Sequence, residues 1–289
     1  MVSLTERYGS VLKNISKSYL LNLEIPVPKT TENIQKWVDE ISKPYNEKNE
    51  KQTRLKDLEI DIQNRIKEIT ENEECDEVEL GSICDINNET MKQNQFTQIN
   101  YIDISSVKEG KINDIKVFDN NFPSRAKRIV RKDDILYSTV RPNLKCYTFM
   151  NDCIPNCVAT TGFAVIRLKN VSNSRFIYYT LMDDRVTQYL IDNSSGTSYP
   201  AVNPGAFEKI KIKVPKNSKL ITSMNSIFQE IEALQTEIKT ADELYKQYIQ
   251  ELGNEAKQGN AKEESNIVIN KLVQAPIVKI RKIKKHTTV

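Results

Sequence analysis

The chain contains an internal repeat in which a short tail leads directly into a helical segment. Residues 9–28 align without a gap with residues 196–215, and the two copies end in Ile-Pro-Val-Pro and Ile-Lys-Val-Pro. The matched apolar pairs are Ile15 and Val202, Leu20 and Phe207, Leu23 and Ile210, and Ile34 and Ile221. A repeat of this kind indicates a recurring supersecondary unit. Because only the second copy has a domain body before it, residues 1–28 are interpreted as the remnant tail of a first domain.

Two segments have the spacing of amphipathic helices. The apolar positions are Ile34, Trp37, Val38, Ile41, Leu55, Leu58, Ile62, Ile66 and Ile69 in the first segment, and Ile221, Met224, Phe228, Ile231, Ile238, Tyr245, Ile249 and Leu252 in the second. This spacing predicts long helices over 29–72 and 217–252. Pro44 predicts a kink or break because it removes a backbone donor. Gly253 is expected to end the second helix. Gln235 and Asp242 are expected as polar residues in its seam, the row of heptad positions that faces a partner helix.

Residues 76–215 have the composition of a mixed α/β domain. Four runs of β-branched and aromatic residues predict strands, at Val78–Gly81, Gln98–Ile104, Asp134–Ser138 and Gly162–Leu168. The stretch 174–190 has helical spacing instead. The predicted domain therefore combines a sheet with one or two packed helices and is flanked by the two long helical segments.

Composition excludes several classes of function. The only histidine, His286, lies in a basic tail, so catalysis by Ser-His or Cys-His pairs has no base. The chain has no phosphate-binding glycine loop, and its five cysteines form no CxxC pair. We therefore expect no catalytic residue, no metal and no cofactor. With no apolar run near the ~20 residues of a membrane span and no secretory signal, an intracellular, cytoplasmic protein with reduced thiols is expected.

The formal net charge of only +3 means that any argument for nucleic-acid binding depends on local patches. Residues 123–145 hold the strongest one, with seven positive and two negative side chains. The candidate DNA contacts are Arg125, Lys127, Arg128, Arg131, Ser138, Arg141, Asn143 and Lys145, with Thr197, Ser198, Tyr199 and Asn203 in a second loop. Arginine suits guanine and asparagine suits adenine. A charged surface and a turn without any ligand would explain both segments equally well.

The order of several motifs resembles the target-recognition domain of type I restriction–modification specificity subunits. The motifs are ELGSICDI at 79–86, YIDISSVKEGKI at 101–112, the basic segment 123–145, ATTGFAVIRL at 159–168 and GTSYPAVNPGAFEKIKIKVP at 196–215. The resemblance covers roughly residues 9–252. It implies recognition domains held apart by an antiparallel coiled-coil spacer, each reading half of a split DNA site. It also implies that catalysis belongs to partners, the modification methyltransferase and the restriction subunit.

The predicted helices fit the role of a spacer. About 36 helical residues span ~54 Å, which exceeds one turn of duplex at ~34–36 Å. A homodimer or a complementary half-subunit would restore a second recognition domain, whereas a decayed remnant would not. The alternative function is a coiled-coil assembly protein whose α/β domain binds protein. The polar and basic segment 253–289 is compatible both with nucleic-acid contact and with a solvated tail.

Overall fold

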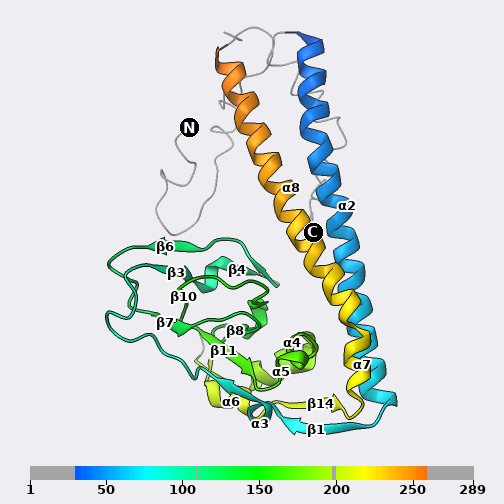
Figure 1. The fold of residues 1–289 in the computed structure, drawn as a ribbon, viewed down its shortest axis with the longest axis vertical. Coiled ribbons are helices and arrows are strands. Elements are labelled where there is room, and N and C mark those ends of the chain that lie inside the picture. The colour runs from blue at the N-terminus through cyan, green and yellow to red at the C-terminus, as the bar shows by residue number, and fades with distance from the viewer. Residues whose placement is uncertain (1–29, 109, 197–199, 259–289) are drawn as a thin grey trace, which may run out of the picture. The chain divides into compact units, whose positions relative to one another are not determined.

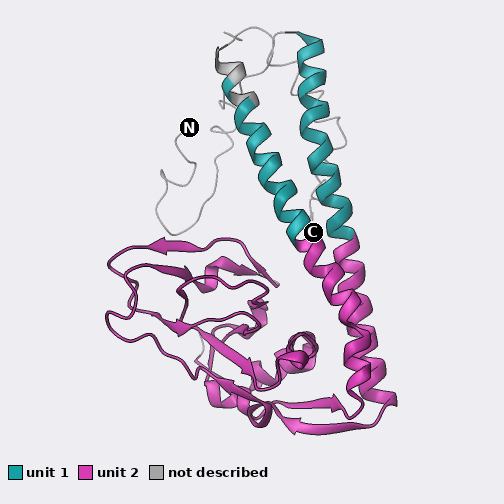
Figure 2. Ribbon diagram, viewed as in Figure 1, with its two compact units in different colours: residues 1–53, 236–289 teal, residues 54–235 magenta. Residues whose placement is uncertain are grey.

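The computed structural model describes residues 30–108, 110–196 and 200–258 (Figure 1). The chain divides into two compact units, residues 54–235 and residues 1–53 with 236–289 (Figure 2), and each is described by itself. The first copy of the repeat, the side chains of Thr197, Ser198 and Tyr199, and the basic tail lie outside the described residues.

Two long helices confirm the predicted helical segments. They are α2 (Thr31–Asn72) and α8 (Asn225–Gln258), the latter preceded by the short α7 (Ser218–Ser223). Pro44 does not break α2, contrary to expectation. Its ring is buried, and this packing offsets the single backbone hydrogen bond that proline removes. The end predicted at Gly253 is also wrong, because a glycine inside a helix costs only about 1 kcal/mol and helix-forming residues follow it as far as Gln258.

In the larger unit the facing sides of α2 and α8 are apolar. Leu55, Leu58, Ile62, Ile66 and Ile69 are buried on α2, as are Ile221, Met224, Phe228 and Ile231 on α7, α8 and the residue between them. Gln235 does not serve as a polar seam residue, since its Oε1 accepts a hydrogen bond of 3.2 Å from Nδ2 of Asn151, which lies just after β9. This part of the helix pair is therefore joined to the body of the domain.

In the smaller unit the helix pair relies more on polar contacts. Lys48 pairs with Asp242, and Lys51 pairs with Glu237 at 3.0 Å. Residue numbers rise along α2 as they fall along α8, so the two helices are antiparallel. Ile238 and Ala241 are the buried positions of α8 here, while Asp242 lies at the edge of the seam with 28% of its side chain exposed. The expected buried polar residue is thus a partly exposed ion pair.

Two four-stranded sheets form the body of the larger unit. The first has the order β6-β3-β10-β7 and the second β2-β11-β8-β9. The first contains β3 (Ile99–Ile102), β6 (Lys116–Phe118), β7 (Ala126–Ile129) and β10 (Cys157–Thr160); the second contains β2 (Cys84–Ile86), β8 (Ile135–Ser138), β9 (Tyr147–Phe149) and β11 (Phe163–Leu168). Only β3 and β10 pair in parallel, and the other pairs in these sheets are antiparallel.

Shorter elements complete the domain. An antiparallel ribbon of β1 (Cys75–Glu79) and β14 (Lys211–Pro215) follows α2 and precedes α7. The remaining elements are α3 (Leu80–Ile83), η1 (Ile104–Ser106), β4 (Val107–Lys108), β5 (Lys111–Ile112), η2 (Pro142–Leu144), η3 (Val171–Asn173), α4 (Ser174–Leu181), α5 (Asp184–Asp192), β12 (Ser194–Ser195), β13 (Ala201–Val202) and α6 (Pro204–Glu208). The strand predicted at 78–81 is only half right, because the chain turns into α3 at Leu80. The other three predicted strands and the helical stretch 174–190 are confirmed.

Apolar residues from both sheets form one core. Ile102, Leu136, Ala159 and Phe163 are fully buried and belong to a single cluster. On α4, Tyr179 stacks on Phe228 of α8 with ring centroids 5.6 Å apart, and Gln63 of α2 donates to the carbonyl of Tyr179 at 2.8 Å. These contacts fix the sheets on the adjacent part of the helix pair within the larger unit. The predicted class, an α/β domain flanked by two long helices, is confirmed.

Candidate nucleic-acid interface

Four segments that are distant in sequence meet at one end of the two sheets. The amide of Thr161 donates to the carbonyl of Arg125 at 2.9 Å, and the amide of Thr139 donates to that of Gly162 at 2.8 Å. The amide of Arg141 donates to the carbonyl of Pro200 at 2.8 Å. We call this surface the loop rim and define it as residues 125, 139–146, 161–162 and 200–203. The two loops predicted from sequence as DNA contacts are therefore neighbours.

A strained turn protrudes from the loop rim. Arg141 (φ 49°, ψ 63°) and Lys145 (φ 50°, ψ 42°) both have left-handed backbone conformations, and η2 lies between them. Left-handed conformations are unfavourable for residues other than glycine and are concentrated at functional sites. Pro142 is buried at the first position of η2, whereas Asn143 and Leu144 are exposed. The turn thus presents two side chains to solvent from an anchored base.

Ser138 supports this turn from inside and is not a DNA contact. Its side chain is fully buried, and its hydroxyl donates to the carbonyl of Val140 at 2.7 Å and accepts from the amide of Val140 at 3.1 Å. Both hydrogen bonds hold the chain as it leaves β8. The sequence-based assignment of Ser138 is wrong because the last residue of β8 points into the core.

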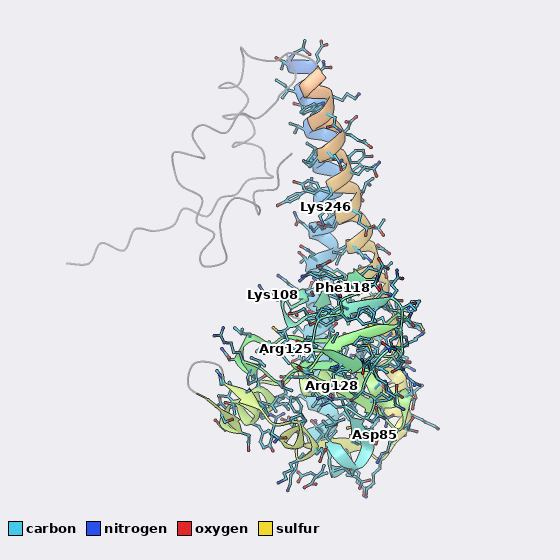
Figure 3. The ribbon with its side chains drawn as sticks, turned by 90° about the vertical axis from the view of Figure 1, so that its left-hand side faces the viewer. Asp85, Lys108, Phe118, Arg125, Arg128 and Lys246 are labelled. Atoms are coloured by element: carbon cyan, nitrogen blue, oxygen red, sulfur yellow. The ribbon has the colours of Figure 1, made fainter. Side chains whose placement is uncertain are left out.

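The remaining basic residues near the rim lie on and beside β7. Arg125 and Lys127 are exposed, and within the described residues neither forms an ion pair. Arg128 is half-buried, and burial lowers the pKa of its guanidinium. Its Nε is buried without a hydrogen-bond partner in the described structure. Figure 3 shows Arg125 and Arg128 on the face of the sheets that is turned to the viewer.

Lys145 and Asn203 contribute to the rim in different ways. The Nζ of Lys145 lies 2.5 Å from Oδ1 of Asp184 at the start of α5, so this ion pair ties the strained turn to a helix. Asn203 caps α6, and its Oδ1 accepts a hydrogen bond of 3.0 Å from the amide of Gly205. Its Nδ2 group takes no part in that bond and carries the two donors that an asparagine offers to a ligand.

Arg131 lies at the opposite end of the sheets, which is not where the sequence reading placed it. Strand β7 separates it from Arg125, and the turn after β7 holds it beside Glu89, with Nη2 of Arg131 2.7 Å from Oε1 of Glu89. We use "the opposite end" for residues 130–134 and 150–157. The structure brings together the two ends of the basic segment and leaves its middle apart from them.

A buried ion pair stabilises the opposite end. Arg167 on β11 donates to both carboxylate oxygens of the fully buried Asp134, at 2.8 and 2.7 Å, and also contacts Glu89 at 2.9 Å. Burial raises the pKa of Asp134, although the hydrogen bonds from Arg167 act in the other direction. The hydrogen bonds with Asp134 raise the pKa of Arg167. Bidentate pairing with satisfied oxygens is the geometry that a buried carboxylate requires.

The family model described as "Type I restriction modification DNA specificity domain" matches residues 72–248. The chain belongs to this family. It is 25% identical over 143 residues to the HindI specificity subunit of Haemophilus influenzae, a match that covers 48% of this chain and 31% of that relative. The chain therefore spans about a third of the length of this curated specificity subunit.

Solved structures of the same family are similar to the chain. One is the HsdS subunit of Thermoanaerobacter tengcongensis, at 27% identity and a TM-score of 0.45, with 59% of this chain and 47% of that chain covered. Another is the type I restriction–modification S subunit of M. genitalium, at 14% identity and a TM-score of 0.48, with 85% and 67% covered.

The specificity domain also contains rim residues that sequence reasoning did not select. Thr161 is exposed in the turn between β10 and β11, and Gly162 follows it. A Cβ atom at Gly162 would lie 2.3 Å from Cδ1 of Ile104, so a larger residue there would require the end of the Ile104 side chain to move. The signal in the sequence is the Thr-Thr-Gly turn between two apolar strands. Leu144 was missed because an apolar residue in a basic segment gives no polar signal.

The described residues contain neither a metal-binding cluster nor a membrane-spanning helix. No group of three or more His, Cys, Asp and Glu side chains is arranged to hold a metal ion there. None of the helices in these residues combines the length and the apolar character needed to cross a bilayer.

Proposed function

We propose that this chain reads DNA sequence and directs a type I restriction–modification complex to its target. The supporting observation is the loop rim, where exposed basic and amide side chains from separate loops of a specificity domain converge on one surface. Arg125 and Lys127 suit phosphate contacts, and Arg141, Asn143 and Asn203 suit base edges. Lys145 positions the turn through Asp184. Thr197, Ser198 and Tyr199 remain predicted contacts in the segment that follows Gly196.

Catalysis is assigned in this proposal to partner subunits. The partners are a modification methyltransferase and a restriction subunit, and the chain supplies only the recognition of the target sequence. We also propose the boundaries 76–215 for the recognition domain and 29–72 for the first helical spacer, with 1–28 as the remnant tail of a first recognition domain. The second spacer begins at 217 and continues past the predicted end at 252, because α8 extends to Gln258. A second recognition domain, from another copy of the chain or from a complementary chain, would then bind the other half of a split DNA site.

The decisive experiment is selection from a random duplex library at about 150 mM salt, the condition under which specific and non-specific binding separate. The full chain is used with and without a candidate methyltransferase partner. Enrichment of one short motif would indicate that one recognition domain binds DNA. Enrichment of two motifs at a fixed spacing would indicate that two recognition domains bind. A folded protein that enriches nothing in either condition would overturn the proposal in favour of an assembly protein that binds protein.

A single substitution then tests the assigned surface. Replacing Arg141 with Gln is expected to weaken binding to the selected duplex by roughly 5- to 150-fold, which corresponds to the ~1–3 kcal/mol of a bidentate contact to guanine. The matched control is Arg65→Gln on α2, where the arginine only pairs with Asp61 one turn away. Equal affinities of the two variants would remove Arg141 from the interface without affecting the selection result.

A further inference from the structure

Leu144 is the most exposed apolar side chain of the loop rim. Its side chain is 51% exposed although its neighbour Pro142 is buried in the same turn. Single exposed leucines are common on protein surfaces and need no explanation by themselves. Leu144 differs because it occupies the tip of a turn whose two ends, Arg141 and Lys145, are both left-handed.

Contacts on every side hold this turn in place. The amide of Leu144 donates to the carbonyl of Arg141 at 2.9 Å, and the amide of Lys145 donates to the carbonyl of Pro142 at 3.0 Å. Arg141 is hydrogen-bonded to Pro200, and Lys145 is paired with Asp184. A side chain that a rigid turn presents to solvent loses little entropy when it binds a ligand. The strain has no role in packing Leu144, because most of that side chain remains outside the core.

The side chains around Leu144 restrict the chemical class of ligand group that it can contact. Arg141 and Asn143 offer hydrogen-bond donors, so the ligand is polar around this point, while Leu144 requires an apolar group. In the major groove the apolar group on a base edge is the C5-methyl of thymine, and apolar side chains read it by contact. A 5-methylcytosine presents a methyl group at the same ring position.

We propose that Leu144 is a specificity-determining residue that contacts the C5-methyl group of a pyrimidine in the target site. This inference deepens the proposed function and rests on it. Asn143, the neighbouring exposed residue, has the amide that pairs with adenine N6 and N7. The tip of the turn is thus suited to a site that contains an A·T pair.

The test uses the duplex obtained by selection and removes methyl groups one at a time. Each thymine is replaced by deoxyuridine, which keeps every hydrogen bond and lacks only the methyl. We expect one position at which the wild-type protein loses about four-fold in affinity, the value of burying one methyl-sized group. Leu144→Ala should bind the thymine duplex about as weakly as the wild type binds the deoxyuridine duplex, and it should show no further loss with deoxyuridine.

The matched control is Val171→Ala, which shortens another exposed apolar side chain, in η3 (56% exposed). It should retain the wild-type response to deoxyuridine. A response that persists in Leu144→Ala, a wild type insensitive at every thymine, or a selected site without any A·T pair would overturn the role of Leu144 while sequence-specific binding remained. Weaker binding of Leu144→Ala with no sensitivity to deoxyuridine in either protein would indicate a wedge between bases instead of a methyl contact. Complete absence of duplex binding would overturn the proposed function itself.

Discussion

The two ends of the recognition sheets use the same basic stretch of sequence in opposite ways. At the loop rim, Arg125 is exposed to solvent, and so is Lys127 two residues further along in β7. At the opposite end, Arg131 is paired with Glu89, which also receives Arg167. A positive charge that already has an acidic partner contributes little to a phosphate surface, because binding would first have to separate the pair. The comparison shows that charge density in a sequence does not by itself locate an interface.

The largest expected effect is on stability at the opposite end. Asp134→Asn removes one charge of the buried pair and leaves Arg167 without its carboxylate, which should lower the free energy of unfolding by about 3–5 kcal/mol. Denaturant titration at 25 °C measures this. Asp133→Asn is the control, since Asp133 has a left-handed backbone (φ 67°) that asparagine tolerates. A loss below about 1 kcal/mol, the range of exposed pairs, would mean that this pair does not stabilise the domain.

Two double variants that remove the same number of positive charges from different places test the comparison directly. Arg125→Ala with Lys127→Ala, and Arg131→Ala with Lys132→Ala, each remove two positive charges. The first pair should weaken duplex binding by about ten-fold or more and reduce the salt dependence by roughly 2 units of slope, near 0.9 for each lost phosphate contact. The second pair should change affinity by less than about two-fold, because its charges lie away from the rim. Equal losses for both variants would place DNA over the whole basic segment.

Thiol labelling tests whether the opposite end of the sheets takes part in DNA binding. Cys153 is exposed at the opposite end, whereas Cys84 and Cys157 are buried and burial raises the pKa of each to about 12. A maleimide should therefore modify Cys153 in the native protein before either buried thiol, which peptide mass spectrometry detects. The bulky adduct at Cys153 should leave DNA affinity unchanged. The labelling is carried out on a Cys146→Ser variant, because Cys146 is a partly exposed thiol of the loop rim. If that labelled variant no longer binds DNA, the interface extends to the opposite end.

The smallest effect concerns the support of the rim by α5. Asp183 caps this helix and binds Arg185, whose side chain lowers the pKa of Asp183 below its usual 3.8. Asp183→Ala should cost about 1 kcal/mol at pH 7 through loss of the cap. Since the folded pKa is lowered, the ionic part of this stability is present above pH 3.8 and is lost as the pH falls through the folded value. Asp183→Asn keeps a capping oxygen and should lack that acid-dependent part; an unchanged acid profile in thermal melts would contradict this.

The long helical segments and the strands β3, β8 and β11 were predictable because their signals are local. Leu55, Leu58 and Ile62 follow the period of a helix, and all three are buried. The errors arose where packing outweighed a local rule. Pro44 remains in α2 because its ring is buried, and Leu80 enters α3 instead of extending β1. Backbone propensities are worth about 1 kcal/mol or less per ordinary residue and about 3 kcal/mol for a proline inside a helix, so tertiary contacts can override them.

For the candidate site, the sequence indicated the residue types and two of the loops, and the fold decided their roles. Ser138 and Arg141 are three residues apart, yet one is buried in the core and the other emerges into the rim. Nothing in the local pattern distinguishes them, because the difference depends on where β8 ends against β11.

By itself the sequence determined the two long helices, several strands of the domain between them and the membership of the family, since periodicity and motif order are properties of the chain. Only the tertiary structure decided which charges face solvent. Arg131 is 42 residues from Glu89, and Arg167 is 33 residues from Asp134. Ion pairs over such distances form only when strands from separate parts of the chain come together, so the sheets determine which arginines stabilise the fold and which remain at the rim.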